Sequence, residues 1–166
     1  MTTRQDFVSR FGGVFEHSAW VAERAHDARP DMPLTAEDVH AGMVVAFRNA
    51  GETERLDVLR AHPDLAGKLA LAGGLTEDSK AEQASAGLDR LSPAEHQRFT
   101  ELNTAYMEKF GFPFIIAVKG LTKDNILEAF ESRIGNTPRQ ELDAAAAQVE
   151  KIAALRLQAM LPGSAE

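Results

Sequence analysis

The chain has 166 residues, 44% of them hydrophobic, with a formal net charge of −7 and no cysteine. This length and composition predict a single domain over residues 1–166. The acidic balance without a basic stripe excludes nucleic acid and anionic membranes as expected partners. No apolar run approaches the roughly 20 residues that span a bilayer. The lack of cysteine excludes thiolate chemistry.

Helical periodicity runs through most of the chain. In chain order it predicts helices that begin at Thr3, span residues 14–27, run from a Thr35 cap to Arg48, span 53–61 and 79–90, begin at the Ser92–Glu95 capping box, begin at a Thr122 cap, and run from Thr137 to about Met160. The expected fold is all-α. It is a compact single-domain bundle of about eight helices with one short extended buried segment.

That extended segment runs from Gly111 to Val118 and is rich in β-branched and aromatic residues. It is typical of a buried strand, yet the chain offers no second strand to pair with it. Buried amides and carbonyls need hydrogen-bond partners. In one interpretation side chains or waters supply them. In the other, a bound ligand rich in amide groups pairs with this backbone as a strand would.

His62 is the first candidate for chemistry. Pro63 forces the helix over 53–61 to end at or just before His62, because proline disfavours the α region for the preceding residue. The negative end of a helix dipole favours imidazolium, which suits a proton donor near neutral pH. The alternative interpretation is a histidine that only caps the helix.

Ser79-Lys80-Ala81-Glu82 fits a capping box, with Ser79 at the N-cap and Glu82 bonded back to its amide. In the alternative interpretation, Glu82 and Gln83 lie at an open helix N-terminus whose amides gather around an anion. Ser79 and Gln83 would then add neutral hydrogen bonds to the same ligand. The spacing itself favours the cap.

Arg156 lies on the apolar stripe of the last helix, which runs through Leu142, Ala145, Val149, Ile152 and Met160. A guanidinium on a core-facing stripe needs a carboxylate partner or a ligand anion, unless it extends to solvent. The other histidines show no shared spacing with acidic residues, so no metal site is expected.

Three motifs together resemble the 2-oxo-4-hydroxy-4-carboxy-5-ureidoimidazoline decarboxylase family. They are Ala61-His-Pro-Asp-Leu-Ala-Gly67, Ser79-x-x-Glu-Gln-x-x-Ala-Gly-Leu88, and Asn103-x-x-Tyr-x-x-x-Phe-Gly-Phe-Pro-Phe-Ile115. The resemblance extends from Phe15 to Leu157. The chain departs from the family pattern at Ala19, where a proline is expected after Ser18, and this departure should affect helix entry rather than chemistry. The loop from Lys68 to Thr76 is generic.

The resemblance implies decarboxylation of the ureidoimidazoline to (S)-allantoin and CO2, the last step from urate to allantoin, without cofactor or metal. His62 would donate the proton, with Glu82 as the acidic catalytic member. The substrate would contact Pro63, the wall of Ser79, Lys80, Ala81, Glu82 and Gln83, and the backbone of Phe114, Ile115, Ile116, Ala117 and Val118. Arg156 would anchor its carboxylate, with Arg133 as the alternative.

The expected partner is a small-molecule substrate, and the family often forms homodimers. The N-terminus lacks the apolar stretch of a signal peptide and the C-terminus is not a peroxisomal address, so cytoplasm is the default location. The competing hypothesis is an inactive helical module that binds a purine catabolite or a partner protein.

Overall fold

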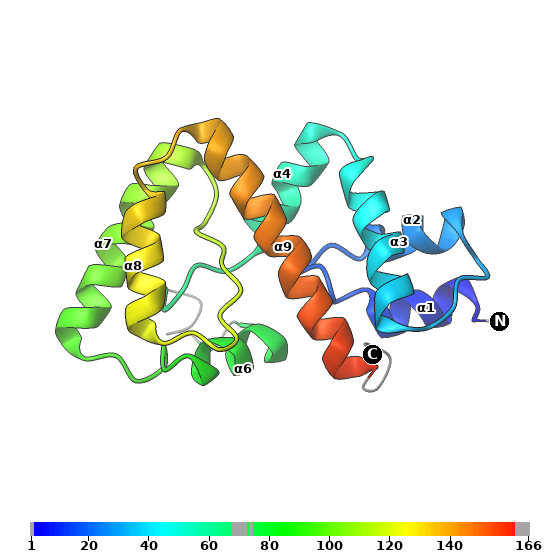
Figure 1. Ribbon diagram of the computed structural model, residues 1–166, viewed down its shortest axis with the longest axis horizontal. Coiled ribbons are helices and arrows are strands. Elements are labelled where there is room, and N and C mark those ends of the chain that lie inside the picture. The colour runs from blue at the N-terminus through cyan, green and yellow to red at the C-terminus, as the bar shows by residue number, and fades with distance from the viewer. Residues whose placement is uncertain (1, 68–72, 74, 162–166) are drawn as a thin grey trace. The chain divides into compact units, whose positions relative to one another are not determined.

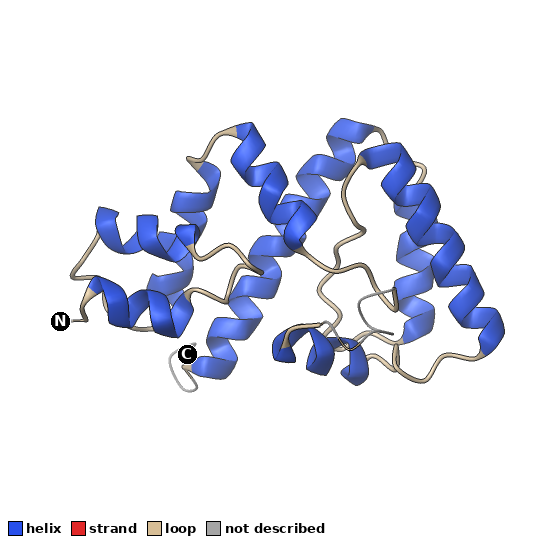
Figure 2. Cartoon of the chain, turned by 180° about the vertical axis from the view of Figure 1, so that it is seen from behind, coloured by secondary structure: helices blue, strands red, loops and turns tan. Residues whose placement is uncertain are grey.

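A computed structural model describes residues 2–67, 73 and 75–161. Within those ranges it has eight helices, labelled in Figure 1: α1 (Arg4–Phe11), α2 (Trp20–Ala28), α3 (Ala36–Arg48), α4 (Glu52–Ala61), α6 (Glu77–Ser85), α7 (Pro93–Phe110), α8 (Lys123–Arg133) and α9 (Pro138–Met160). The same ranges contain no strand (Figure 2). The prediction of an all-α fold is confirmed.

The chain divides into two compact units, one formed by residues 1–61 and 149–166 and the other by residues 62–148. The boundary therefore falls inside α9. The expectation of a single domain stays a prediction. In the first unit the fully buried aromatic side chains are those of Phe7, Phe11, Phe15 and Phe47. In the second they are those of Phe99, Tyr106, Phe114 and Phe130. None of the described helices is long and apolar enough to cross a membrane.

Most helix starts were predictable because the capping signal is local. Thr3, Thr35 and Thr122 each accept a hydrogen bond from the backbone amide three residues on, as N-caps do. Ser92 forms the expected box: its Oγ accepts from the Glu95 amide at 3.2 Å, and Glu95 Oε1 accepts from the Ser92 amide at 2.9 Å. These starts are confirmed.

The predicted start of the second helix at residue 14 is wrong. The helix begins at Trp20, because His17 takes a left-handed conformation with φ of 50° and turns the chain. Val14 and Phe15 are still buried, so their apolar spacing reflects burial and not helix. Ala19 becomes the N-cap, with no side-chain hydrogen bond to the helix.

The capping box predicted at Ser79 is also wrong. Thr76 is the N-cap of α6, and its Oγ1 accepts from the Ser79 amide at 3.2 Å. Thr76 is followed by Glu77 and Asp78, whose charges suit the first turn of a helix. Glu82 therefore lies in the second turn of α6 and is not a capping residue. The interpretation that Glu82 and Gln83 lie at an open helix N-terminus is wrong for the same reason. Of the loop from 68 to 76, residues 68–72 and 74 lie outside the described residues.

Candidate functional site

The turn that follows His62 has a defined geometry. Helix α4 ends at Ala61, as Pro63 predicts, and His62 is buried at 7% exposure. Gly67 leaves no room for a side chain: a Cβ there would lie 1.8 Å from Oδ1 of Asp64. The Asp64 carboxylate thus fills the space that a side chain at position 67 would need, which explains why a glycine stands three residues after the aspartate in the histidine-bearing motif.

The amide side chains of two residues outside this turn form hydrogen bonds with its backbone. The Ala66 amide donates to Oε1 of Gln83 at 3.0 Å, and Nε2 of Gln83 donates to the Asp64 carbonyl at 3.3 Å. Nδ2 of Asn103, on α7, donates to the Leu65 carbonyl at 2.8 Å. The turn after His62 is therefore hydrogen-bonded to both α6 and α7. Gln83 holds the backbone of this turn, in addition to the substrate contact predicted for it.

The predicted site residues on α6 differ in burial. Ser79 and Gln83, one turn apart, are buried at 4% and 6% exposure, and Glu82 is half-buried. The side chains of Lys80 and Ala81 are exposed. The buried side of α6 thus combines a hydroxyl and an amide, with a carboxylate beside them.

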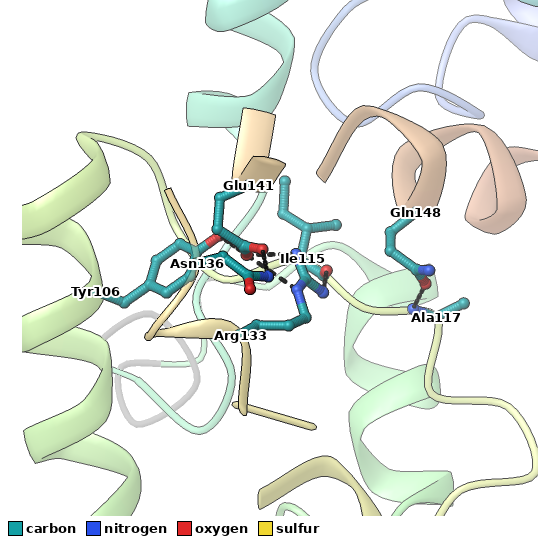
Figure 3. Close-up of polar contacts among 7 residues, drawn as sticks. All are labelled: Tyr106, Ile115, Ala117, Arg133, Asn136, Glu141 and Gln148. Atoms are coloured by element: carbon teal, nitrogen blue, oxygen red, sulfur yellow. Dashed lines mark hydrogen bonds and ion pairs between the residues drawn. The ribbon is translucent and has the colours of Figure 1, made fainter. Parts of the chain in front are cut away.

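The segment 112–118 is neither helix nor strand, and all of its residues are buried except the half-buried Ile116. Side chains bind two of its backbone groups (Figure 3). Nη1 of Arg133 donates to the Ile115 carbonyl at 2.7 Å, and the Ala117 amide donates to Oε1 of Gln148 at 2.9 Å. For these two groups the interpretation in which side chains supply the partners is confirmed.

Glu141 is the centre of a buried polar cluster in the same unit (Figure 3). Its carboxylate is fully buried and accepts from the Tyr106 hydroxyl at 2.5 Å, from Nε of Arg133 at 2.9 Å and from Nδ2 of Asn136 at 2.9 Å. Burial raises the pKa of Tyr106, and the hydrogen bond to Glu141 raises it further, so Tyr106 remains a donor at neutral pH. The buried carboxylate is thereby fully compensated.

Both arginines considered for the substrate carboxylate already bind a protein carboxylate. Arg133 pairs with Glu141 in the second unit. In the first unit, Nη2 of Arg156 lies 2.9 Å from Oε2 of Glu16, and both side chains are almost fully buried. Nη1 of Arg156 also donates to the Val14 carbonyl at 3.4 Å. The expected burial of Arg156 on the α9 stripe is confirmed, whereas Met160 on the same stripe is exposed.

Sequence reasoning missed Glu141, Gln148 and Asn103. Glu141 lies four residues before Ala145 and eight before Val149, on the same buried side of α9, so the signal that singled out Arg156 applied to it as well. Asn103 is the first residue of the third family motif, but the motif assigned it no role. Gln148 gave no signal, because a half-buried glutamine on a helix is ordinary.

Among the described residues there is no group of three or more histidine, aspartate or glutamate side chains that could hold a metal ion.

A histidine on a turn and a carboxylate on a helix are residue types that serve acid–base catalysis on a small molecule. The family of the chain and its relatives make the protein an all-α enzyme. The chain belongs to the OHCU decarboxylase family, whose model matches residues 1–158.

Similar proteins agree with this membership. The chain is 42% identical over 151 residues to a 2-oxo-4-hydroxy-4-carboxy-5-ureidoimidazoline decarboxylase of Haloferax volcanii, which covers 91% of this chain and 86% of the relative. A crystal structure of (S)-allantoin synthase is similar with a TM-score of 0.77 and 33% identity, over 96% of this chain and 51% of that one. A crystal structure of an OHCU decarboxylase in the presence of (S)-allantoin is similar with a TM-score of 0.71 and 28% identity, over 89% of this chain and 94% of that one.

Proposed function

We propose that this protein is a carboxy-lyase that converts 2-oxo-4-hydroxy-4-carboxy-5-ureidoimidazoline to (S)-allantoin and CO2, the last step from urate to allantoin. The observation that carries the proposal is the match of one family model over residues 1–158. Relatives that bear this activity in their names cover most of the chain and support the same step.

The chemistry explains why acid–base residues are enough. The substrate carries its carboxylate on a carbon next to a C=N group that is conjugated with the ureido arm. When CO2 leaves, the bonding electrons flow into that C=N group, so the substrate is its own electron sink. The enzyme has to hold the carboxylate out of conjugation, polarise the acceptor and protonate one face.

His62 is the proton donor in this proposal, and delivery to one face makes one allantoin enantiomer. A positioned acid contributes on the order of 10²–10⁴ in rate. Its place on a turn bonded to α6 and α7 supports this role, because a turn held on two sides fixes the donor. Pro63 would line the substrate beside it.

The other proposed substrate contacts come from α6 and from the backbone of the segment 114–118. Glu82 would accept a hydrogen bond or a proton from the hydroxyl or ring amide, and the stretch from Ser79 to Gln83 would form one wall. The backbone of residues 114–118 would bind the ring and ureido amides and stabilise developing charge. The half-buried state of Glu82 supports its part, since the carboxylate combines shielding with access.

A direct test follows allantoin by circular dichroism. Urate is freshly oxidised and treated with the hydrolase of the preceding step, with and without this protein. We expect the protein to accelerate the appearance of an optically active product. Slow or racemic allantoin in both samples would reject the proposed function.

Activity should survive the removal of metals. Because the substrate accepts its own electrons, exhaustive chelation followed by assay in metal-free buffer is expected to leave kcat unchanged. The measurement is the same dichroism assay, with the chelated protein compared with an untreated sample. A loss that added zinc or magnesium restores would mean that the electron sink lies elsewhere.

Arg156→Lys should weaken substrate binding more than stability. The ammonium keeps the positive charge that Glu16 requires, but it lacks the planar fork that holds a second carboxylate. We therefore expect KM to rise while the melting temperature changes little. A variant with a lowered melting temperature and an unchanged KM would assign Arg156 to the buried ion pair alone.

A homodimer and a cytoplasmic location complete the proposal. The homodimer comes from the resemblance to the family, and the cytoplasm is the default location. Light scattering at assay concentration tests the first, and fractionation of the source cells tests the second.

A further inference from the structure

The segment 114–118 is fixed at two points, both in the second unit. Gln148 binds the Ala117 amide, and Arg133 binds the Ile115 carbonyl while Glu141 holds Arg133 in place. Glu141 and Gln148 are seven residues apart on α9, which is two helical turns, so they lie on the same side of that helix. Figure 3 shows both side chains pointing toward the segment.

Arg133 has little freedom to move. Its guanidinium lies 4.4 Å from the centroid of the Phe114 ring, and that ring stacks on Phe130 with centroids 4.0 Å apart and planes 8° apart. The carboxylate that holds Arg133 also accepts from Tyr106 and Asn136. Stacking on Phe114 and the charge of Glu141 therefore fix the guanidinium, and the two hydrogen bonds from Tyr106 and Asn136 fix Glu141 in turn. Arg133 can thus hold the Ile115 carbonyl rigidly.

The opposite ends of the two held peptide units are the N–H and the C=O of Ile116. Within the described part of the chain, the N–H and C=O of Ile116 make no hydrogen bond. Ile116 is also the one residue of 112–118 that is half-buried and not buried. Backbone groups of this kind are the ones that a ligand with amide edges can bind.

We propose that Gln148 and the Arg133–Glu141 pair are positioning residues for substrate binding. By occupying the Ala117 amide and the Ile115 carbonyl, they keep the Ile116 peptide groups turned toward the amide edge of the substrate. The inference rests on the proposed function, because it needs a substrate that binds this segment. None of the three side chains touches the reacting atoms in this account.

Gln148→Leu tests the proposal most directly. The substitution keeps the approximate size of the side chain and removes the acceptor for the Ala117 amide. We expect KM for the ureidoimidazoline and Kd for allantoin to rise about fivefold to tenfold, the worth of about one hydrogen bond. Because the proton donor is untouched, kcat should change less than about twofold. The measurements are steady-state kinetics and titration calorimetry with allantoin.

Two matched variants separate positioning from packing. Gln148→Glu keeps an oxygen acceptor for the Ala117 amide, so it should restore most of the affinity for allantoin, a neutral ligand that the added charge disturbs little. Gln158→Leu makes the same change as the test variant at an exposed position of α9 and should behave like the parent. Hydrogen exchange should be faster across 112–118 in Gln148→Leu alone, with a melting temperature only a few degrees lower.

The outcomes distinguish this inference from the proposed function. If the parent makes optically active allantoin and Gln148→Leu binds allantoin as the parent does, the positioning role is rejected and the proposed function stands. Equal losses in the Leu and Glu variants reject it too, because they indicate packing. If the parent itself neither turns over nor binds allantoin, the proposed function fails and this inference fails with it.

Discussion

His62→Asn is expected to abolish most of the activity while the protein stays folded. Asparagine tolerates helix ends and can keep a hydrogen bond, but it cannot donate a proton as an acid near neutral pH. We expect kcat to fall by about 10² or more, the contribution of a positioned general acid. The dichroism assay measures the rate, and thermal unfolding checks the fold.

His17→Asn is the matched control. His17 is exposed and has a φ of 50°, a left-handed conformation that asparagine accepts well. This variant should keep parental activity, because the side chain of His17 is exposed and His17 is not among the proposed site residues. If a folded His62→Asn protein turns over at nearly the parental rate, His62 has no catalytic role and serves only at the end of α4.

Glu82→Gln should fold normally and turn over poorly. Because Thr76 and not Ser79 caps α6, Glu82 has no capping task, and glutamine is as good a helix residue as glutamate. The substitution therefore removes only the negative charge. We expect kcat to fall by on the order of 10², as for the loss of a general base or acceptor.

Two controls on α6 accompany Glu82→Gln. Glu77→Gln makes the same change at an exposed position and should keep full activity. Thr76→Ala removes the cap and should cost about 1 kcal/mol of stability in urea unfolding. Kinetics for Glu82→Gln that equal those of the parent would leave His62 as the acid–base residue of this part of the chain.

The helices and their caps were predictable where the signal is local. Ser92 and Glu95 satisfy each other within one turn, so their identities suffice to place the start of α7. The same reasoning failed at Ser79 because Thr76, three residues earlier, is an equally good cap and has acidic neighbours on its helix side. Local rules cannot choose between two adjacent candidates when the loop before them is generic.

The partners of buried polar residues were not predictable, because they come from distant parts of the chain. The α9 stripe predicts that Arg156 is buried, yet Glu16, its partner, is 140 residues away. Likewise, a ligand or a side chain could serve the amides of 114–118 equally well on sequence grounds. Only the placement of Gln148 and Arg133 decides the matter for two of those groups.

The contact between Asp64 and Gly67 has a consequence for natural variation. A side chain at position 67 collides with the Asp64 carboxylate and with no backbone atom among its nearest neighbours. The space at position 67 is therefore limited by the Asp64 side chain and not by a neighbouring backbone. Among related sequences the two positions should covary: a larger residue at 67 requires that the Asp64 side chain turn away or be replaced by a smaller one.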